Sequence, residues 1–316
     1  MKKSPQPATG ENVTWTPVVA NAGRIQSGQP GYVVPLKQSE VHKQASVPIE
    51  EILQPIHLSY KIMKKHAGAA SGEKLLMSYV DSRVKAAINE MKEHMGRSIY
   101  SDGTPESNAE GAILPNLQGM GIIGDRDATY AGLATALYPS WQPAELVLNS
   151  ATGGSWAGIT FTGTAPTFAE MISSTEEYYL PGLLDIVIDA CTFGSQSPDV
   201  ITCGPLYHSL LHRAISNKEQ VTKGEFGFKT FMYRGIPVEL DKLCPAGEID
   251  VWTTEQLGIG GLPGQMIDLE EGGFERAGKN TDFVVNNINF SGNLVCLERR
   301  KQGRLTGLAT TLAVAP

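Results

Sequence analysis

EKLLMSYVDSRVKAAINEMKEHM, residues Glu73–Met95, is the longest stretch of the chain with one unbroken helical pattern. Its apolar residues recur every three or four positions and so share one face of a helix; they are Leu76, Tyr79, Val80, Val84, Ala87, Ile88, Met91 and Met95. Ser71 can cap the start of this helix, and Gly96 can close its end. The helix is a rod of about 35 Å, and its apolar face predicts a sheet on which it lies.

The composition is ordinary for a soluble globular protein and argues against several functions. The 316 residues are 41% hydrophobic and 19% charged, enough for one large or two ordinary domains. The net charge of -7, with no cationic run longer than Arg299-Arg300-Lys301, disfavours binding to nucleic acid phosphates, acidic substrates or membrane surfaces. The start of the chain has no apolar signal-peptide segment, and no apolar run reaches the length of a membrane span. We therefore expect a protein that is cytosolic when it is made.

The cysteines are widely spaced and form no C-x-x-C pair; they are Cys191, Cys203, Cys244 and Cys296. A disulfide framework or a zinc site needs closer grouping or companion histidines. The spacing predicts four buried free thiols in a reducing compartment.

The first seventy residues predict an extended arm followed by a hairpin. Residues 1–36 lack a sustained period and predict an extended arm, although Trp15 and the Val18-Val19 pair suggest that it lies on a surface. Residues 38–70 predict a hairpin in which Val41–Ile49 pairs with a strand whose buried face carries Ile56, Leu58, Tyr60 and Ile62. Because one ribbon cannot bury both of its faces, this hairpin needs a neighbour.

The rest of the chain alternates between strand and helix patterns. We call the predicted helix at Glu73–Met95 the spine helix. Between this helix and about residue 148, Gly, Pro and Asp predict short strands and turns. Further on, the patterns predict helices at 167–177, 183–191 and 206–215, strands at 200–203 and 249–252, and a hairpin at 226–240 that turns at Arg234-Gly235. The Pro181-Gly182 step is expected to separate the first two helices. The segment 183–253 is therefore a compact α/β subdomain, and residues 283–312 are strands that return to the spine helix.

Gly119, Gly121 and Gly124 match the G-x-G-x-x-G outline of a dinucleotide-binding loop, with Glu145 about twenty residues beyond. The preceding residues are interrupted by Pro115 and make a poor first strand. The following Gly-Asp-Arg-Asp would place carboxylates where a pyrophosphate should bind. The context favours glycine turns over a cofactor site.

Other chemical motifs are incomplete. His208 and His212 share a helix face, but no general-base Glu and no third ligand accompany them, which favours a solvated or interface face over a metal site. The GAASGEK stretch at 68–74 only faintly matches a phosphate loop, and Gly154-Ser155-Trp156-Ala157 lacks the second glycine of a nucleophile elbow. We nominate no catalytic, cofactor-binding or metal-binding residue. A well-patterned core with an arm, an unpaired hairpin and no chemical site predicts a protein that functions by assembly rather than as an enzyme.

The order of segments resembles the major capsid proteins of tailed bacteriophages, the Hong Kong ninety-seven type of shell fold. The matching stretches are 73–95 with Ser101-Asp102-Gly103, Gly124–Tyr130 with Pro139–Gln142, Leu183–Cys203, Pro205–Asn217, Gly227–Phe231 with Arg234–Val238 and Asp241, Asp250-Val251-Trp252, Ser291–Val295 and Leu305–Leu308. The resemblance spans about residues 36–310, and residues 151–174 contain no matching motif. No long scaffolding region precedes the arm, so the resemblance implies either cleavage of such a region or a separate scaffolding protein.

The resemblance implies an α+β fold with five parts. They are an N-terminal arm at 1–36, an extended hairpin loop at 37–70, a peripheral domain with the spine helix at 71–165, an axial domain at 166–268, and return strands of the peripheral domain with the C-terminus at 269–316. The hairpin would lie over a neighbouring subunit, the arm would clasp another, and the axial domain would meet its copies around five-fold and six-fold axes.

The implied function is a structural capsid protein whose pentamers and hexamers form an icosahedral head around double-stranded DNA. The implied partners are further copies of itself, portal and scaffolding proteins, and a decoration protein, with no membrane and no sequence-specific DNA binding; the implied location is the virion capsid, and the host cytoplasm during assembly. Some shells of this fold cross-link a hairpin lysine to a neighbour's asparagine. Lys61, Lys64 and Lys65 lie in the matching loop, where solvated lysines are the commoner case. The alternatives are a bacterial nanocompartment shell and a cytosolic oxidoreductase that uses Gly119 to Gly124.

Overall fold

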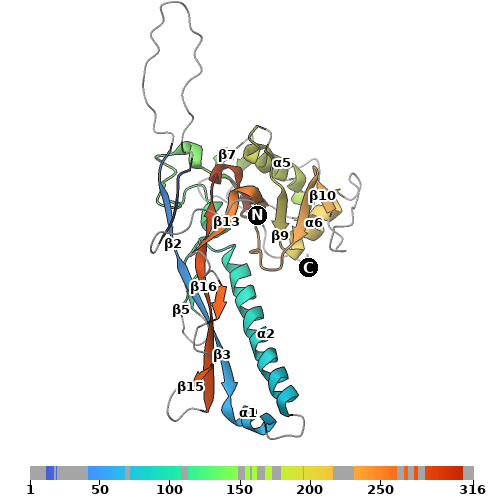
Figure 1. The fold of residues 1–316 in the computed structure, drawn as a ribbon. Coiled ribbons are helices and arrows are strands. Elements are labelled where there is room, and N and C mark those ends of the chain that lie inside the picture. The colour runs from blue at the N-terminus through green and yellow to red at the C-terminus, as the bar shows by residue number, and fades with distance from the viewer. Residues whose placement is uncertain are drawn as a thin grey trace, which may run out of the picture.

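The computed structural model shows a long body and a compact body joined side by side (Figure 1). It describes residues 12–17, 19, 42–67, 72–107, 113–148, 154–156, 159–161, 168–172, 179–194, 196–215, 231–261, 267–269, 274–276 and 282–308. The long body contains the spine helix and a long antiparallel ribbon. The compact body is a six-stranded sheet covered by two helices. Among the described residues, no helix is long and apolar enough to cross a membrane.

The long body is built on α2 (Gly72–Ser98), β3 (Glu50–Ser59) and β16 (Phe283–Cys296). β3 and β16 are antiparallel over ten positions, from Ser59 opposite Phe283 to Glu50 opposite Gly292. The alternate residues of each strand face α2 and form one core with it, namely Ile52, Ile56, Leu58, Ala87, Met91, Leu117, Val284, Ile288 and Phe290. The sheet that the spine helix required is therefore made by strands far apart in the sequence.

The predicted helix face is confirmed, with one correction at the helix end. Ala87 and Met91 are buried, and Tyr79, Val80, Val84, Ile88 and Met95 pack against them; the side chain of Leu76 and the cap residue Ser71 lie outside the described residues. Gly96 does not end the helix, which continues to Ser98. A Cβ at Gly96 would lie 2.6 Å from Leu243 Cδ1, so this glycine permits close packing against the compact body.

The predicted hairpin at 38–70 is wrong in its pairing. Ile56 and Leu58 are buried on one strand face as expected, but the strand ends at Ser59, and Tyr60 and Ile62 belong to α1 (Tyr60–Ala67). Tyr60 N donates to Asp282 O at 2.7 Å, which ties the chain to the neighbouring segment where the ribbon ends. The Val41–Ile49 segment does not pair with β3. Instead β2 (Ala45–Pro48) pairs with β1 (Asn12–Trp15).

A central core joins the first strands to the long body. Val13, Trp15 and Val19 are buried there with Tyr130, Trp141, Trp252 and Cys296. Trp15 and Val19 of the predicted arm therefore do find a surface, and it belongs to their own chain; Val18 lies outside the described residues. β13 (Leu257–Gly261), β14 (Ile267–Leu269) and β15 (Glu275–Arg276) all pair with β16 and complete the five-stranded sheet.

The compact body is a six-stranded mixed sheet in the order β10-β11-β9-β12-β17-β6. The strands are β10 (Phe231–Tyr233), β11 (Ile236–Leu240), β9 (Val200–Cys203), β12 (Ile249–Trp252), β17 (Gly303–Thr306) and β6 (Ala144–Val147). Helices α5 (Leu180–Cys191) and α6 (Pro205–Ile215) pack into the apolar core of this body. The predicted α/β subdomain is confirmed.

Details of the compact body follow from local chemistry. Arg234 and Gly235 have φ of 51° and 80°, the positive values of a tight turn between two strands, which confirms the predicted hairpin over its described part. The Pro181-Gly182 step does not separate two helices; Pro181 lies in the first turn of α5, where its missing N–H has no cost. α4 (Phe168–Ile172) covers the described part of the predicted helix at 167–177.

The remaining elements are short. They are β4 (Glu106–Ser107), β5 (Ile113–Leu114), α3 (Met120–Ile123), a 3-10 turn at Pro139–Trp141, β7 (Gly154–Trp156), β8 (Ile159–Phe161), and 3-10 turns at Thr254–Gln256 and Arg299–Lys301. The expectation of short strands and turns before residue 148 is confirmed. The five domain ranges stay a prediction, to which the structure adds that β6 and β17, from outside 166–268, join the compact sheet.

Candidate functional site

The two faces of the six-stranded sheet differ in chemistry. One face is apolar and packs against α5 and α6 through residues such as Ile201, Ile249 and Leu305. The alternate residues point the other way, and strand register places them in a row: Thr202 lies opposite Asp250, Asp250 opposite Arg304, and Arg304 opposite Glu145. This row, which we call the polar row, faces the region of α3.

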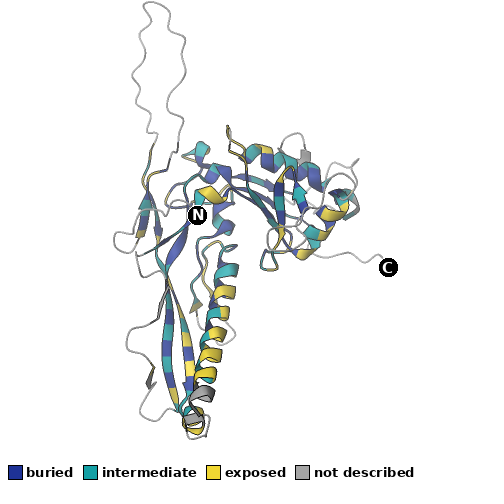
Figure 2. Cartoon of the chain, turned by 45° about the vertical axis from the view of Figure 1, so that its right-hand side comes forward, coloured by how far each residue is buried: buried dark blue, intermediate teal, exposed yellow. Residues whose placement is uncertain are grey.

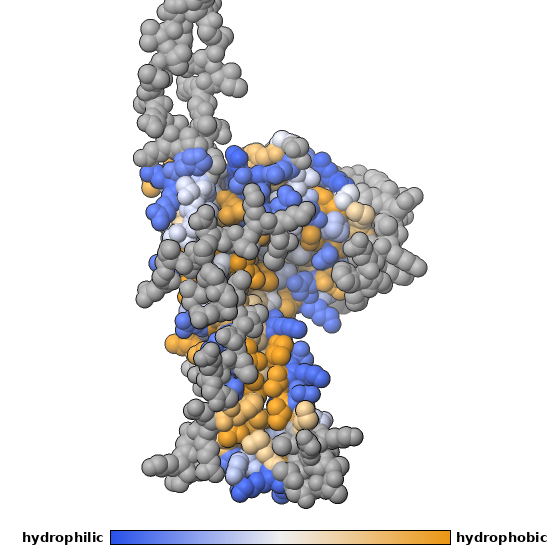
Figure 3. All heavy atoms as spheres, in the orientation of Figure 1, coloured by the Kyte–Doolittle hydropathy of each residue, from blue (hydrophilic) through white to orange (hydrophobic). Residues whose placement is uncertain are grey.

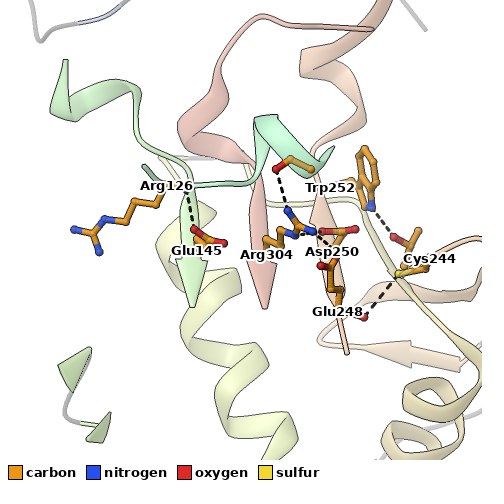
Figure 4. A network of polar contacts seen from close by, with 9 residues as sticks. Arg126, Glu145, Cys244, Glu248, Asp250, Trp252 and Arg304 are labelled. Atoms are coloured by element: carbon orange, nitrogen blue, oxygen red, sulfur yellow. Dashed lines mark hydrogen bonds and ion pairs between the residues drawn. The ribbon is translucent and has the colours of Figure 1, made fainter. Parts of the chain in front are cut away.

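Arg304 connects the polar row to α3, as Figure 4 shows. Its guanidinium forms an ion pair with Glu248, and its Nε lies 3.6 Å from Asp250 Oδ1. Its Nη1 donates a hydrogen bond of 3.1 Å to the carbonyl of Gly121 in α3. One buried cation therefore holds two carboxylates of the sheet and one backbone carbonyl of the neighbouring layer.

Tyr100 makes a second connection, just beyond the end of α2. Its hydroxyl donates to Asp241 Oδ2 at 2.7 Å, and its ring meets the Trp252 ring edge-on with centroids 6.0 Å apart. Trp252 Nε1 in turn donates to Thr202 Oγ1 at 2.6 Å. Burial raises the pKa of Tyr100, so the hydroxyl keeps the proton that it donates. The end of the spine helix is thus fixed to the compact sheet.

The carboxylates of the polar row are poorly compensated. Asp250 is 0% exposed, and within the described structure neither of its carboxylate oxygens has a hydrogen-bond partner. Burial raises the pKa of Asp250 to about 7, against the opposing effect of Arg304. Burial also raises the pKa of Glu145, which accepts a 2.8 Å hydrogen bond from the backbone N–H of Arg126.

Arg299 forms a second buried cationic centre. Its side chain is fully buried and donates to the carbonyls of Ile123 at 2.7 Å, Ala128 at 2.8 Å and Ile122 at 2.6 Å, and also to the carbonyl of Asp125. Burial lowers the pKa of Arg299 to about 10, so it stays charged at neutral pH. Arg299 therefore holds the loop that follows α3, because the last carbonyls of a helix have no partner within the helix.

The outer face of the β3–β16 ribbon is a candidate contact surface. The residues of β3 that point away from α2 are exposed, namely Glu51, Leu53, Pro55 and His57. Leu53 is 57% exposed and Phe283 of β16 is 51% exposed. Figure 2 shows this alternation of buried and exposed positions, and Figure 3 shows hydrophobic residues along the lower part of the long body. These two exposed apolar side chains lie on the same face of the ribbon, which makes this face a candidate contact surface.

Two glycines of the G-x-G-x-x-G outline have packing roles, in agreement with the preference for turns over a cofactor site. A Cβ at Gly119 would lie 2.2 Å from the carbonyl oxygen of Ile99, and one at Gly121 would lie 2.5 Å from the backbone nitrogen of Asp102. These glycines let α3 lie directly on the chain that leaves the spine helix. Glu145, the acidic residue about twenty positions beyond these glycines, lies in the polar row.

The other singled-out residues are dispersed. His208 and His212 lie on α6 with their rings 5.0 and 5.6 Å from the ring of Phe231. Within the described residues, no cluster of three or more His, Cys, Asp or Glu could hold a metal ion. The cysteines are free and buried, as predicted.

The lysines considered for cross-linking do not lie in a hairpin. Lys61, Lys64 and Lys65 are exposed on α1, and Lys64 Nζ lies 4.7 Å from the centroid of the Tyr60 ring. The sequence-based location of these lysines was wrong because the strand ends before them. The GAASGEK stretch falls largely outside the described residues, and the Gly154–Trp156 stretch forms β7.

Sequence reasoning missed the polar row and the role of Arg299. The available signals were Asp250, a lone carboxylate within an otherwise apolar strand, and Arg304, a lone cation within a strand pattern. Neither signal identifies a partner, because the residues that meet here come from segments that only the folded sheet brings together.

Comparison of sequences finds no matching family model and no matching curated protein. Comparison of structures finds shell proteins. The fold is similar to the capsid of cyanophage A-1(L), with a TM-score of 0.57, 14% identity, and coverage of 96% of this chain and 89% of that chain. It is similar to the capsid of a native GTA particle, with a TM-score of 0.55, 12% identity, and coverage of 97% and 88%.

An encapsulin is similar to the same degree. The holo-SrpI encapsulin complex from Synechococcus elongatus gives a TM-score of 0.54 and 11% identity, and the match covers 97% of this chain and 85% of that chain. At such identities the likeness establishes the fold. The chain has the Hong Kong ninety-seven type capsid fold.

Proposed function

We propose that this chain is the structural major capsid protein of a tailed bacteriophage, and that its pentamers and hexamers form an icosahedral head around double-stranded DNA. The observation that supports the proposal most is the extent of the likeness. A phage capsid subunit is matched over 89% of its length by 96% of this chain, so both bodies and their connection are shared. The role is mechanical rather than enzymatic.

The geometry suits a shell subunit. The long body spans about 40 Å along the 27 residues of α2. Its ribbon presents Leu53 and Phe283 to solvent, and a second subunit that covers these side chains would remove apolar surface from water. Each such contact can be weak, because many identical contacts in one container act together.

The proposed partners follow from this role. The chain binds further copies of itself, and portal and scaffolding proteins and a decoration protein complete the particle. The packaged DNA is held by confinement without sequence recognition, which agrees with the net charge of -7. The protein is placed in the virion capsid, and in the host cytoplasm during assembly.

Electron microscopy of negatively stained protein tests assembly directly. The full chain, expressed alone and with a scaffolding partner, is expected to form closed shells or regular hexamers and pentamers. The variant Leu53→Asp is expected to reduce shell formation strongly while its circular dichroism stays that of the wild type, because it places a charge on the ribbon surface without touching the core. A wild-type chain that stays a compact monomer under both conditions contradicts the proposal.

The second candidate is a bacterial nanocompartment shell, favoured by the similar likeness to the encapsulin. The contents of purified particles discriminate the two functions: nuclease-protected double-stranded DNA supports the phage capsid, and an enclosed protein cargo supports the nanocompartment. The oxidoreductase alternative is disfavoured because close packing accounts for Gly119 without a cofactor. A Cβ at this position would lie 2.2 Å from the backbone carbonyl oxygen of Ile99. Tight binding of a nicotinamide cofactor would restore that alternative.

A further inference from the structure

The polar row contains more negative than positive charge in a buried layer. Its carboxylates are Glu145 and Asp250, Glu248 joins them through its ion pair with Arg304 just before β12, and the only cation of this cluster in the described structure is Arg304. The side chains of Asp250 and Arg304 are 1% and 9% exposed. If all three carboxyl groups were ionised, the cluster would carry an uncompensated buried charge, which is costly in a medium of low polarity.

The groups packed around Asp250 offer no second cation in the described part of the chain. The charges that act on it are those of Arg304, Glu248 and Glu145. The thiols of Cys203 and Cys244 lie near it and are neutral, because burial raises the pKa of each. The guanidinium of Arg126 points away from the cluster, as Figure 4 shows, and only its backbone N–H reaches Glu145.

The layer on the other side of the cluster carries further acidic and polar groups. Asp102 lies within the electrostatic reach of Arg304, and the backbone N–H of Thr104 holds the pKa of Asp102 below its usual range. Asp125 acts on Glu145 as a like charge. Tyr100 is neutral, since burial raises its pKa. Arg299 acts on Asp125 and Glu145 as an opposite charge, but the charges that act on Asp250 are those of Arg304, Glu248 and Glu145. The layer therefore supplies no second cation to Asp250 itself.

We propose that this cluster is a proton-binding site, and that the proton it takes up sets how firmly α3 is held on the six-stranded sheet. Arg304 is the element that responds. With Asp250 ionised, the guanidinium is shared between Glu248, Asp250 and the carbonyl of Gly121. When a proton from solvent binds an Asp250 oxygen, the attraction to Asp250 is lost and the guanidinium is held by Glu248 and Gly121 alone.

The direction of the effect follows from linkage. The pKa of Asp250 is raised from 3.8 to about 7 in the folded chain, so the folded state binds more protons than the unfolded state between these values. The resulting stabilisation is present on the acid side and is lost as the pH rises through about 7. Above that pH the junction contains an ionised, buried and poorly compensated carboxylate.

Equilibrium unfolding of the full chain between pH 5 and pH 8.5 tests the site. For the wild type, the unfolding constant is expected to rise with pH by up to about tenfold per unit below pH 7, since one proton is released. Asp250→Asn, a neutral side chain of the same shape, is expected to lose this part of the slope. Asp189→Asn is the matched control and should keep the wild-type slope, because Asp189 is an exposed aspartate of α5 that pairs with Arg234 in the turn between β10 and β11.

Two readouts separate a proton site from a merely structural residue. Amide exchange in residues 119–124, corrected for the intrinsic rate, is expected to be faster at pH 8 than at pH 6 in the wild type and equal in Asp250→Asn. The infrared difference spectrum between these pH values should show a protonated carboxyl band that the variant lacks. If Asp250→Asn does not fold, Glu145→Gln replaces it; removal of that like charge should move proton uptake to lower pH.

The proposal is overturned if Asp250→Asn keeps the wild-type slope, or if the wild type lacks both the slope and the carboxyl band. In the Glu145→Gln arm, an unmoved uptake pH overturns it. These measurements report the stability and protonation of the folded chain, and they do not depend on the oligomeric form in which it is purified. They therefore stand or fall separately from the capsid function.

Discussion

Replacing Arg299 by methionine removes the cation that holds the loop after α3. Methionine keeps a long apolar stem but has no donor, so the carbonyls of Ile122, Ile123, Asp125 and Ala128 all lose a partner. Ile122 and Ile123 are the last residues of α3, whose terminal carbonyls cannot be satisfied within so short a helix. We expect the loop 124–130 to separate from the central core.

The size of the effect follows from these contacts. An orphaned buried carbonyl costs about 1–3 kcal/mol, so four of them would cost about 4–12 kcal/mol. Two effects reduce this figure: the variant no longer buries a charge, and the loop can move to let water reach some of the carbonyls. A hydrogen bond to a charged group contributes about 1.5–3 kcal/mol, so the loss of two bonds that water does not replace costs about 3–6 kcal/mol. We expect Arg299→Met to destabilise the chain by about that amount.

Chemical denaturation followed by tryptophan fluorescence measures the effect, because Trp141 and Trp252 share the central core with Tyr130. The matched control is Arg300→Met, one residue further on. Arg300 is partly exposed and lies 3.6 Å from Glu298, a contact worth about 1 kcal/mol or less. Equal destabilisation by the two variants would refute the reasoning, since it would mean that the buried carbonyl contacts of Arg299 contribute nothing beyond a surface charge.

Three further results are expected. In thermal unfolding, Gly119→Ala should destabilise the folded chain by more than about 3 kcal/mol, because its Cβ would lie 2.2 Å from the Ile99 carbonyl oxygen. The control Gly182→Ala, whose Cβ would have its nearest neighbour at 3.7 Å, should be neutral or stabilise the chain by about 0.5–1 kcal/mol. Met91→Ala in the long-body core should lower the free energy of unfolding by about 2–5 kcal/mol. Met77→Ala should lower it by about 0.5 kcal/mol or less, because the Met77 side chain is 64% exposed. Equal losses in denaturant titrations would contradict the assigned packing. The four thiols should resist iodoacetamide at pH 8 until the chain is unfolded, since burial raises the pKa of each; rapid labelling of the native chain would argue otherwise.

The elements that the sequence predicted well are those whose pattern is local. The spine helix, α5, β9 and α6 each carry their own period, and the positive-φ turn at Arg234-Gly235 is specified by adjacent residues. The fold class followed from their order. The end of the spine helix was wrong because Gly96 serves close packing against Leu243, a contact that no local pattern contains.

The pairings that failed are long-range. The partner of β3 is β16, more than 200 residues further along, and a strand pattern does not state its partner. The nearby segment at 41–49 was the natural choice, yet its strand β2 pairs with β1. The candidate site has the same origin, because Glu145, Asp250 and Arg304 become neighbours only through the register of β6, β12 and β17.

Electron microscopy of particles purified from cells that express the full chain tests shell assembly itself. We expect closed icosahedral shells in which the long body of one subunit contacts its neighbours through the ribbon face that carries Leu53 and Phe283. A homogeneous 34.0 kDa monomer, with and without a scaffolding partner, would contradict it.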